Sequence, residues 1–275
     1  MLPGRRTDTG AIYVTQGPPP AGTPLVGGIA VSPAGVIYAS QSVVPVFSPL
    51  DLFSAGEQGV FFDPSDLSTM FQDSAGGVPV TADGQPVGLI LDKSGRNNHA
   101  SQATAAKRPL YKTDGTLHWL QFDGVDDFIG CTWPTIPNAS TLFTGAMRAS
   151  AASCVMFTPV ENDPSRFICV AQAGSTQRPD GNVEEPKYNI NGLILSPVER
   201  GAFDTALGIS TAKVISVEDV NLSVLPWLGF GVGAYSGFSA PLNIYSLIVL
   251  GRLATTQEIT DTETWVANKT GVTLP

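Results

Sequence analysis

The sequence predicts an all-β fold: a two-sheet jelly-roll sandwich, preceded by an extended N-terminal β arm and followed by a short C-terminal helix. Glycine and proline account for 29 and 22 of the 275 residues, whereas charged residues make up only 14%. Ordinary globular proteins contain about 25% charged residues. Many turns and few charged helix faces are typical of a β-sandwich, and the hydrophobic content of 43% is sufficient to fill a core.

Residues 1–54 form the predicted arm, because they contain a twofold repeat. The segment "GAIYVTQGPPP" at 10–20 recurs as "GVIYASQSVVP" at 35–45, and each copy is typical of a short strand bounded by Gly or Pro. Two such strands cannot form an independent core. Either they pack on the main domain of the same chain, or they pair with neighbouring subunits by strand addition; we favour the second interpretation. The apolar positions expected to make these assembly contacts are Ile12 and Tyr13 in the first copy and Ile37 and Tyr38 in the second.

Residues 55–275 form the predicted sandwich. From residue 87 onwards, apolar β-rich runs alternate with clusters of turn residues, a pattern that suits a two-sheet sandwich or jelly roll. The runs are "VGLILD", "LHWLQF", "DFIGCTW", "SCVMFTPV", "RFICVAQ", "YNINGLILS", "ALGIST", "KVISVE", "LGFGVGAYS" and "LNIYSLIVL".

Two segments of this domain carry helix signals. The stretch "FFDPSDLSTMFQD" predicts one short helix or turn with Asp63 as its N-cap. Near the C-terminal end, Thr255 and Glu258 have the spacing of a capping box, and Gly271 is placed to terminate the helix. We expect Trp265 to pack this terminal helix on the sandwich.

The charge and the apolar runs exclude two classes of partner. The formal net charge is −9, and no Lys/Arg cluster is present of the kind that nucleic-acid binders use to release counterions. The longest apolar run near the C-terminal end is far shorter than the ~20 residues of a membrane span. We therefore expect neither nucleic-acid binding nor membrane insertion.

Three cysteines leave at least one thiol unpaired. Cys131, Cys154 and Cys169 all lie in or beside apolar runs, where free cysteine behaves as a small core residue. A bridge between Cys154 and Cys169 is one alternative. Reduced thiols in a protein made in the cytoplasm are the simpler interpretation.

The stretch "LQFDGVDDFIG" places Asp123, Asp126 and Asp127 between two expected strands. Asp followed by Gly is a strong hairpin signal, because Gly accepts positive φ and Asp bonds nearby amides. Three carboxylates in one turn are also suitable ligands for Ca²⁺, although the EF-hand pattern is absent. A structural turn is our first interpretation, a calcium site the second and catalysis the third; no other cofactor is predicted.

Several motifs in this order resemble a known superfamily. The segments "DKSGRNNHASQ", "RPLY" and "LQFDGVDDFI", together with the ending "IYSLIVLGRLATTQEITDTETWVANKTG", are similar to the concanavalin A-like, laminin-G-like jelly-roll superfamily. The opening "GVFFDPSDLSTMFQDSAGGVPVTADGQPVG" and the repeat of the arm resemble the versions found in structural proteins of tailed phages and prophages.

The resemblance implies a virion structural protein: a head decoration, a head fibre or a tail-fibre-like appendage. Its arm would bind other virion proteins, its sandwich would project and contact host glycans, and it would form a homo-oligomer, with a trimer expected. It would be made in the bacterial cytoplasm and located in the virion. Since the superfamily also contains lectins and glycosidases, a carbohydrate-binding lectin outside any particle is the alternative, and a glycoside hydrolase is less well supported.

The sequence does not predict an enzyme. Glycosidases of this fold use carboxylates spaced E-x-D-x-x-E, across the short gap that retention requires. The nearest match supplies Glu161 and Asp163 but has Arg166 in place of the second glutamate. The two histidines, His99 and His118, lack the spacing of a zinc site.

A glycan contact is predicted at three residues. Sugar sites combine aromatic faces with amide or carboxylate groups, and the candidates are Trp119, Asn97 and Asn98. Aromatic residues in a β-sandwich more often belong to the core, so a structural role is the competing interpretation for Trp119.

Overall fold

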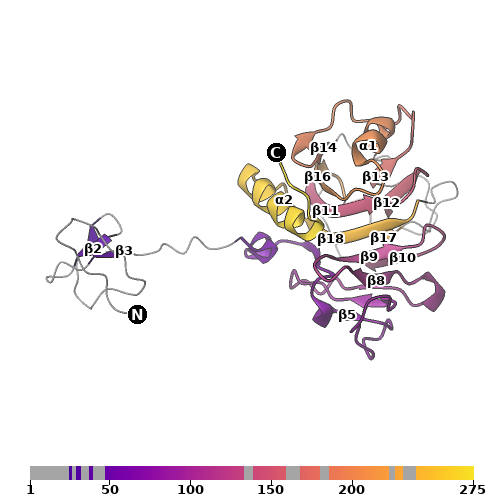
Figure 1. The fold of residues 1–275 in the computed structure, drawn as a ribbon, viewed down its shortest axis with the longest axis horizontal. Helices are drawn as coiled ribbons and strands as arrows, with labels where there is room; N and C mark the ends of the chain where they lie inside the picture. The colour runs from indigo at the N-terminus through magenta and orange to yellow at the C-terminus, as the bar shows by residue number, and fades with distance from the viewer. Residues whose placement is uncertain are drawn as a thin grey trace. The chain divides into compact units, whose positions relative to one another are not determined.

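A computed structural model of the 275-residue chain describes two separate units, Met1–Val46 and Phe47–Pro275 (Figure 1). In the first unit it describes the backbone of three strands. In the second it describes residues 47–132, 139–158, 168–179, 186–222, 227–231 and 240–275.

The first unit contains a small antiparallel sheet with the strand order β1-β2-β3. Its strands are β1 (Leu25–Val26), β2 (Ile29–Val31) and β3 (Ile37–Ala39). Ile37 and Tyr38 lie in β3, so the second copy of the repeat contains a strand. Ile12 and Tyr13 of the first copy lie outside the described residues.

The second unit contains two antiparallel sheets, which confirms the predicted sandwich. The seven-stranded sheet has the order β13 (Ile168–Ala171), β12 (Cys154–Thr158), β17 (Trp227–Gly231), β10 (Phe128–Thr132), β7 (Ala100–Ser101), β6 (Leu89–Ile90) and β5 (Met70–Phe71). The eight-stranded sheet has the order β15 (Leu193–Ile194), β14 (Lys187–Ile190), β16 (Lys213–Val220), β11 (Ser140–Arg148), β18 (Leu242–Leu250), β9 (His118–Phe122) and β8 (Leu110–Thr113), with β4 (Gly59–Phe62) also paired to β18. Short 3-10 helices cover Pro49–Phe53, Leu67–Thr69 and Ala105–Lys107.

The central strand β18 is buried at every position, because both of its faces are covered. Leu247 and Val249 belong to the core between the sheets. Ile248 and Leu250 belong to a second core on the outer face, which they share with Val266 of helix α2 (Thr256–Thr270). This is why the strand is a continuous apolar run and lacks the alternation of a half-buried strand.

Helix α2 closes the outer face as the sequence predicts. Thr255 and Glu258 form the capping box, and Gly271 ends the helix in the left-handed conformation with φ 70°. Trp265 packs edge-on against Phe61 of β4, with ring centroids 5.3 Å apart. The helix approaches the sheet closely over Gly145, where an added Cβ would lie 2.4 Å from the Thr270 side chain.

Two local predictions were wrong. The short helix after β4 is the 3-10 turn Leu67–Thr69, and its N-cap is Asp66 rather than Asp63.

The run "ALGIST" was predicted as a strand, but its first two residues end helix α1 (Arg200–Leu207). That helix buries Phe203 and Leu207 on one face, and the buried ion pair between Asp204 and Arg148 of β11 ties it to the sheet.

The second unit begins at Phe47, earlier than the boundary predicted between residues 54 and 55. Leu52 and Phe53 are buried in the outer-face core with Phe61, so this stretch packs with the sandwich. Across the described part of the chain, the helices are all too short or too polar to span a bilayer.

Candidate functional site

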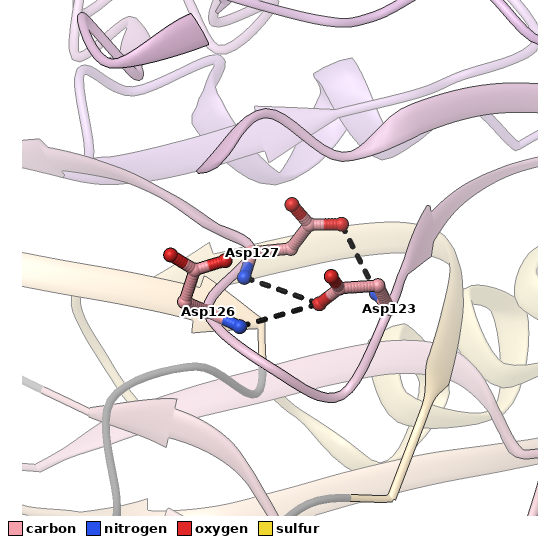
Figure 2. A group of neighbouring side chains, drawn as sticks. All are labelled: Asp123, Asp126 and Asp127. Atoms are coloured by element: carbon pink, nitrogen blue, oxygen red, sulfur yellow. Dashed lines mark hydrogen bonds between the residues drawn. The ribbon is translucent and has the colours of Figure 1, made fainter. Parts of the chain in front are cut away.

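The three aspartates of the β9–β10 turn converge on one another (Figure 2). Asp123 Oδ1 accepts hydrogen bonds from the backbone N–H groups of Val125 at 2.7 Å, Asp126 at 3.3 Å and Asp127 at 3.4 Å. Asp127 Oδ2 in turn accepts from the N–H of Asp123 at 3.0 Å. Gly124 supplies the positive φ of 81° that the turn requires. The predicted turn therefore exists and is closed from both ends by its own carboxylates.

The turn is also electrostatically frustrated. One carboxylate oxygen from each of Asp123, Asp126 and Asp127 lies within 4.8 Å of the others. Burial raises the pKa of Asp127 to about 6, and the charges of its two neighbours push the same way, against the lowering effect of the Asp123 N–H. A divalent cation would relieve this repulsion. Ca²⁺ takes six to eight oxygens, so three carboxylates supply part of a shell that water would complete, and a calcium site stays a prediction.

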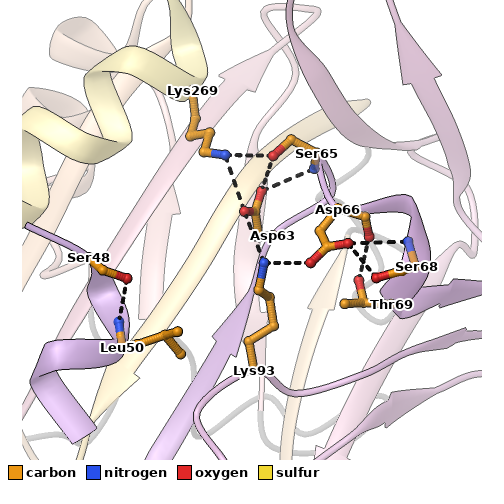
Figure 3. Close-up of polar contacts among 9 residues, drawn as sticks. All are labelled: Ser48, Leu50, Asp63, Ser65, Asp66, Ser68, Thr69, Lys93 and Lys269. Atoms are coloured by element: carbon orange, nitrogen blue, oxygen red, sulfur yellow. Dashed lines mark hydrogen bonds and ion pairs between the residues drawn. The ribbon is translucent and has the colours of Figure 1, made fainter. Parts of the chain in front are cut away.

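A second carboxylate cluster, between β4 and α2, has its cations built in (Figure 3). Buried Asp63 lies 3.1 Å from Lys269 Nζ of α2 and 3.5 Å from Lys93 Nζ. Lys93 also bonds Asp66 at 2.7 Å, and this hydrogen bond holds the pKa of Asp66 below its usual value. Lys269 donates to Ser65 Oγ at 2.5 Å as well. These charges are mutually satisfied, so the cluster fastens the C-terminal helix to the strand that opens the sandwich.

The predicted glycan residues are not brought together. Asn98 is buried and donates from Nδ2 to the carbonyl of Gly59 at 2.8 Å, opposite Leu250 of β18. Trp119 is half-buried against Tyr245 of the same strand, with ring centroids 5.6 Å apart. Five strand positions separate the two places, about 17 Å at the rise of an extended chain. Asn97 is exposed in a left-handed turn with φ 61°.

The polar loop "DKSGRNNH" has an internal structural role that its composition did not reveal. Asp92 accepts hydrogen bonds from the N–H groups of Phe61, Ser94 and Asn98 and from the Ser94 hydroxyl, at 2.7–3.0 Å. His99 Nδ1 accepts from the N–H of Asp92 at 3.0 Å. The loop therefore covers the free side of β4 instead of offering its polar groups to a ligand.

One buried carboxylate was missed by the sequence analysis. Glu263 of α2 accepts a 2.6 Å hydrogen bond from the Ser216 hydroxyl, and burial raises its pKa. Asn189 bridges Ser216 and Glu218 at 3.0 Å each. Glu263, Ser216 and Asn189 are buried between α2 and the sheet, so we assign the network a structural role. The only sequence signal was an acidic residue on the apolar side of the helix.

The remaining predictions concern cysteines and catalytic carboxylates. Cys131, Cys154 and Cys169 are buried and are in no disulfide, and Cys154 lies opposite Ala171 in the strand register. The structure therefore agrees with the prediction of reduced thiols, and the alternative bridge between Cys154 and Cys169 is not formed. Glu161 and Asp163 lie outside the described residues.

Comparisons with known proteins add little to the site. No protein-family model matches the sequence, and no curated protein matches it. A GH54 α-L-arabinofuranosidase soaked with a cyclic sulfate inhibitor matches in structure with a TM-score of 0.48 and 13% identity, over 81% of this chain and 66% of that one. A botulinum neurotoxin serotype D binding domain matches with a TM-score of 0.41 and 10% identity, over 64% and 48%. This chain thus spans about two thirds and half of those proteins, and neither likeness carries an argument about activity.

Proposed function

We propose that this protein is a structural component of a tailed-phage virion, in which the N-terminal unit binds other virion proteins and the sandwich is displayed. The observation that carries the proposal is the division of the chain after Val46. From Phe47 onwards, the chain has its own two cores. It also has its own ion-pair cluster between β4 and α2, formed by Asp63, Asp66, Lys93 and Lys269, which we call the clasp. A module of this kind can be presented without help from the segment that attaches it.

The composition of the first unit supports an attachment role. Its charged residues are Arg5, Arg6 and Asp8. Few charges would therefore oppose the pairing of its strands with another sheet. The strand β3 has one neighbour, β2, in the described part of this sheet. An apolar, sparsely charged edge strand is suited to pairing with another chain. Ile12, Tyr13, Ile37 and Tyr38 are the residues proposed for that contact.

The chemistry of the sandwich favours display over catalysis. Three polar clusters of its described residues are satisfied internally: Asp63 and its two lysines by ion pairs, the Asp92 loop by backbone bonds, and Glu263 by a hydroxyl. None of these clusters leaves a base and a nucleophile facing solvent together, as a hydrolytic site needs.

The test is incorporation into particles. Phage particles from cells expressing the full chain, or a chain lacking residues 1–46, are purified and labelled with gold-conjugated antibody for electron microscopy. Full-length protein should label particles, and the truncated chain should remain folded by circular dichroism yet leave particles bare. Label on the head would indicate a decoration or head fibre, and label on the tail an adhesin. Full-length protein free in the lysate, or unchanged incorporation of the truncated chain, would refute the proposal.

A calcium-dependent lectin is the second candidate, and the convergence of Asp123, Asp126 and Asp127 favours it. Bound calcium on that exposed turn would provide a coordination position for sugar hydroxyls. Glycan-array binding by the full chain, measured with calcium and with a chelator, tests this role. Chelator-sensitive binding to a defined sugar would support it, and an empty array under both conditions would remove it.

A further inference from the structure

Besides β4, the two sheets have four outer strands, and three of these have their free sides covered by adjoining loops. A natural sheet needs such protection, because an open strand edge is a template for pairing with another chain. The covering hydrogen bonds are Tyr111 N–H to Gln85 O at 2.9 Å on β8, Val80 N–H to Met70 O at 3.0 Å on β5, and Val170 N–H to Pro179 O at 2.9 Å on β13.

The fourth outer strand, β15, has no covering loop among the residues that the structure describes. It follows β14 through a two-residue turn in which Asn191 and Gly192 have φ of 52° and 77°, the left-handed pair of a tight hairpin. Ile190 pairs with Leu193, and the N–H of Leu195 bonds Tyr188 O at 2.8 Å. Because hydrogen-bonded and non-hydrogen-bonded pairs alternate, the N–H and C=O of Ile194 point away from β14. Within the described ranges, no backbone group bonds them.

The exposed side chains of β15 are apolar on both faces. Leu193 is 63% exposed and Ile194 is 77% exposed. Leu193 lies on the side of Ile190, at the rim of the core between the sheets, and Ile194 lies on the side of Asn189, towards α2. Edge strands are usually guarded by lysine or another charge, and β15 has none.

We propose that β15 pairs with the β15 strand of a second copy of this chain, joining two eight-stranded sheets edge to edge. One residue, Ile194, presents both a donor and an acceptor outward. An antiparallel pair related by a twofold axis needs just that, because each copy exchanges both bonds with the other. The axis passes beside Ile194, and Leu193 of each copy faces Leu195 of the other.

The length of the edge favours a second copy over a foreign peptide. β15 has two residues, and of these two Ile194 alone directs its N–H and C=O away from β14. A flexible peptide would have to order itself for one reciprocal pair of hydrogen bonds, at an entropic cost that so few contacts do not offset. A second copy brings a strand that its hairpin has already ordered, and four apolar side chains leave water together.

This contact goes beyond the proposed virion role and does not depend on it. An isologous contact produces pairs, whereas the trimer expected from the family resemblance needs a heterologous contact elsewhere. If the first unit forms trimers, the β15 contact would join subunits of different trimers. The failure of one contact is therefore distinguishable from the failure of the other.

Cross-linking of the full chain tests the geometry. Residues in a hydrogen-bonded antiparallel pair have Cα atoms about 5.5 Å apart, within the range that a disulfide can bridge. The three native cysteines are buried, so Ile194→Cys adds the reactive thiol. Mild oxidation should give a covalent dimer with Ile194→Cys and none with Val78→Cys, a control at a residue that is 50% exposed. Equal yields from both variants would refute the pairing.

Sedimentation velocity over a range of concentrations tests the energetics. Ile194→Lys should raise the dissociation constant of the pairing step at least tenfold, because a charge would be buried at the axis. Val78→Lys, with the same change in charge, should leave that step unchanged, and circular dichroism should show both variants folded. A pairing step of unchanged dissociation constant in Ile194→Lys, or wild-type protein that shows no even-numbered step at the highest concentration, would overturn the proposal.

Discussion

The two carboxylate clusters of the sandwich compensate their negative charges in different ways. In the clasp, buried Asp63 is neutralised by Lys93 and Lys269. In the β9–β10 turn, the carboxylates of Asp123, Asp126 and Asp127 converge, and backbone N–H groups donate to Asp123 and Asp127. The clasp joins distant parts of the chain, whereas the turn serves mainly itself. The difference indicates that the fold depends on the ion pairs of the clasp, whereas the carboxylates of the turn could still bind a cation.

The two clusters should respond to acid with opposite signs. The pKa of Asp66 is lowered in the folded protein, so its contribution to stability is present above its unfolded pKa and is lost as the pH falls through the folded value. The pKa of Asp127 is raised to about 6. Its protonated form fits the fold, and stability is lost as the pH rises through about 6.

The largest effect should come from breaking the clasp. Asp63→Ala leaves Lys93 and Lys269 facing each other without their shared partner, and removing one member of a buried ion pair costs about 3 kcal/mol. Urea unfolding at pH 7, followed by tryptophan fluorescence, measures the loss. Asp83→Ala is the matched control, since it removes an Asp–Lys pair with Lys112 that lies at the surface, and its midpoint should not move measurably. Equal losses from the two variants would contradict the structural role of the clasp.

An intermediate effect, of opposite sign, should come from Asp127→Asn. The amide oxygen can still accept from the N–H of Asp123, while the buried charge disappears. The shift from an unfolded pKa near 4 to about 6 corresponds to about 3 kcal/mol without screening. Because the carboxylate is partly screened by solvent, we expect a stabilisation of about 2 kcal/mol above pH 7 and none below pH 4. Urea midpoints of the variant and the wild type, measured from pH 4 to pH 8, should diverge as the pH rises. Parallel curves would show that Asp127 titrates normally.

The same contrast explains which features the sequence could predict. The β9–β10 turn depends on Asp123 and Gly124, which are adjacent, and α2 depends on Thr255 and Glu258, which are three apart, so short-range patterns were sufficient. The clasp joins Asp63 to Lys269 across 206 positions, and no local pattern connects them. The misassigned N-cap has the same cause, since Asp63 is used for a distant lysine and Asp66 is left to cap the turn.

Tertiary contacts also overrode local preference at α1. The run that ends this helix has an apolar character that favours a strand, yet Asp204 pairs with Arg148 of β11 and Phe203 packs against Tyr188. Likewise, Asn98 of the polar loop "DKSGRNNH" was a candidate for a glycan contact, but Asp92 and Asn98 are hydrogen-bonded to the backbone of β4. Polar residues in a loop show their role only when their partners are known.

The smallest effect should come from calcium, and it decides whether the turn is more than a turn. A cation would neutralise the carboxylates that the clasp neutralises with lysine. For a site with a dissociation constant on the order of 1 mM, as in weak extracellular modules, 5 mM calcium would stabilise the fold by about 1 kcal/mol. Thermal unfolding with 5 mM calcium, against 5 mM magnesium as the ionic control, measures the shift. Asp126→Asn should abolish the shift, because it removes one carboxylate ligand of the cation. The turn itself should persist, because Asp126 accepts none of the hydrogen bonds that close it. A melting temperature that is the same in both salts would leave Asp123 and Asp127 as turn residues alone, and would remove the main support for a calcium-dependent lectin.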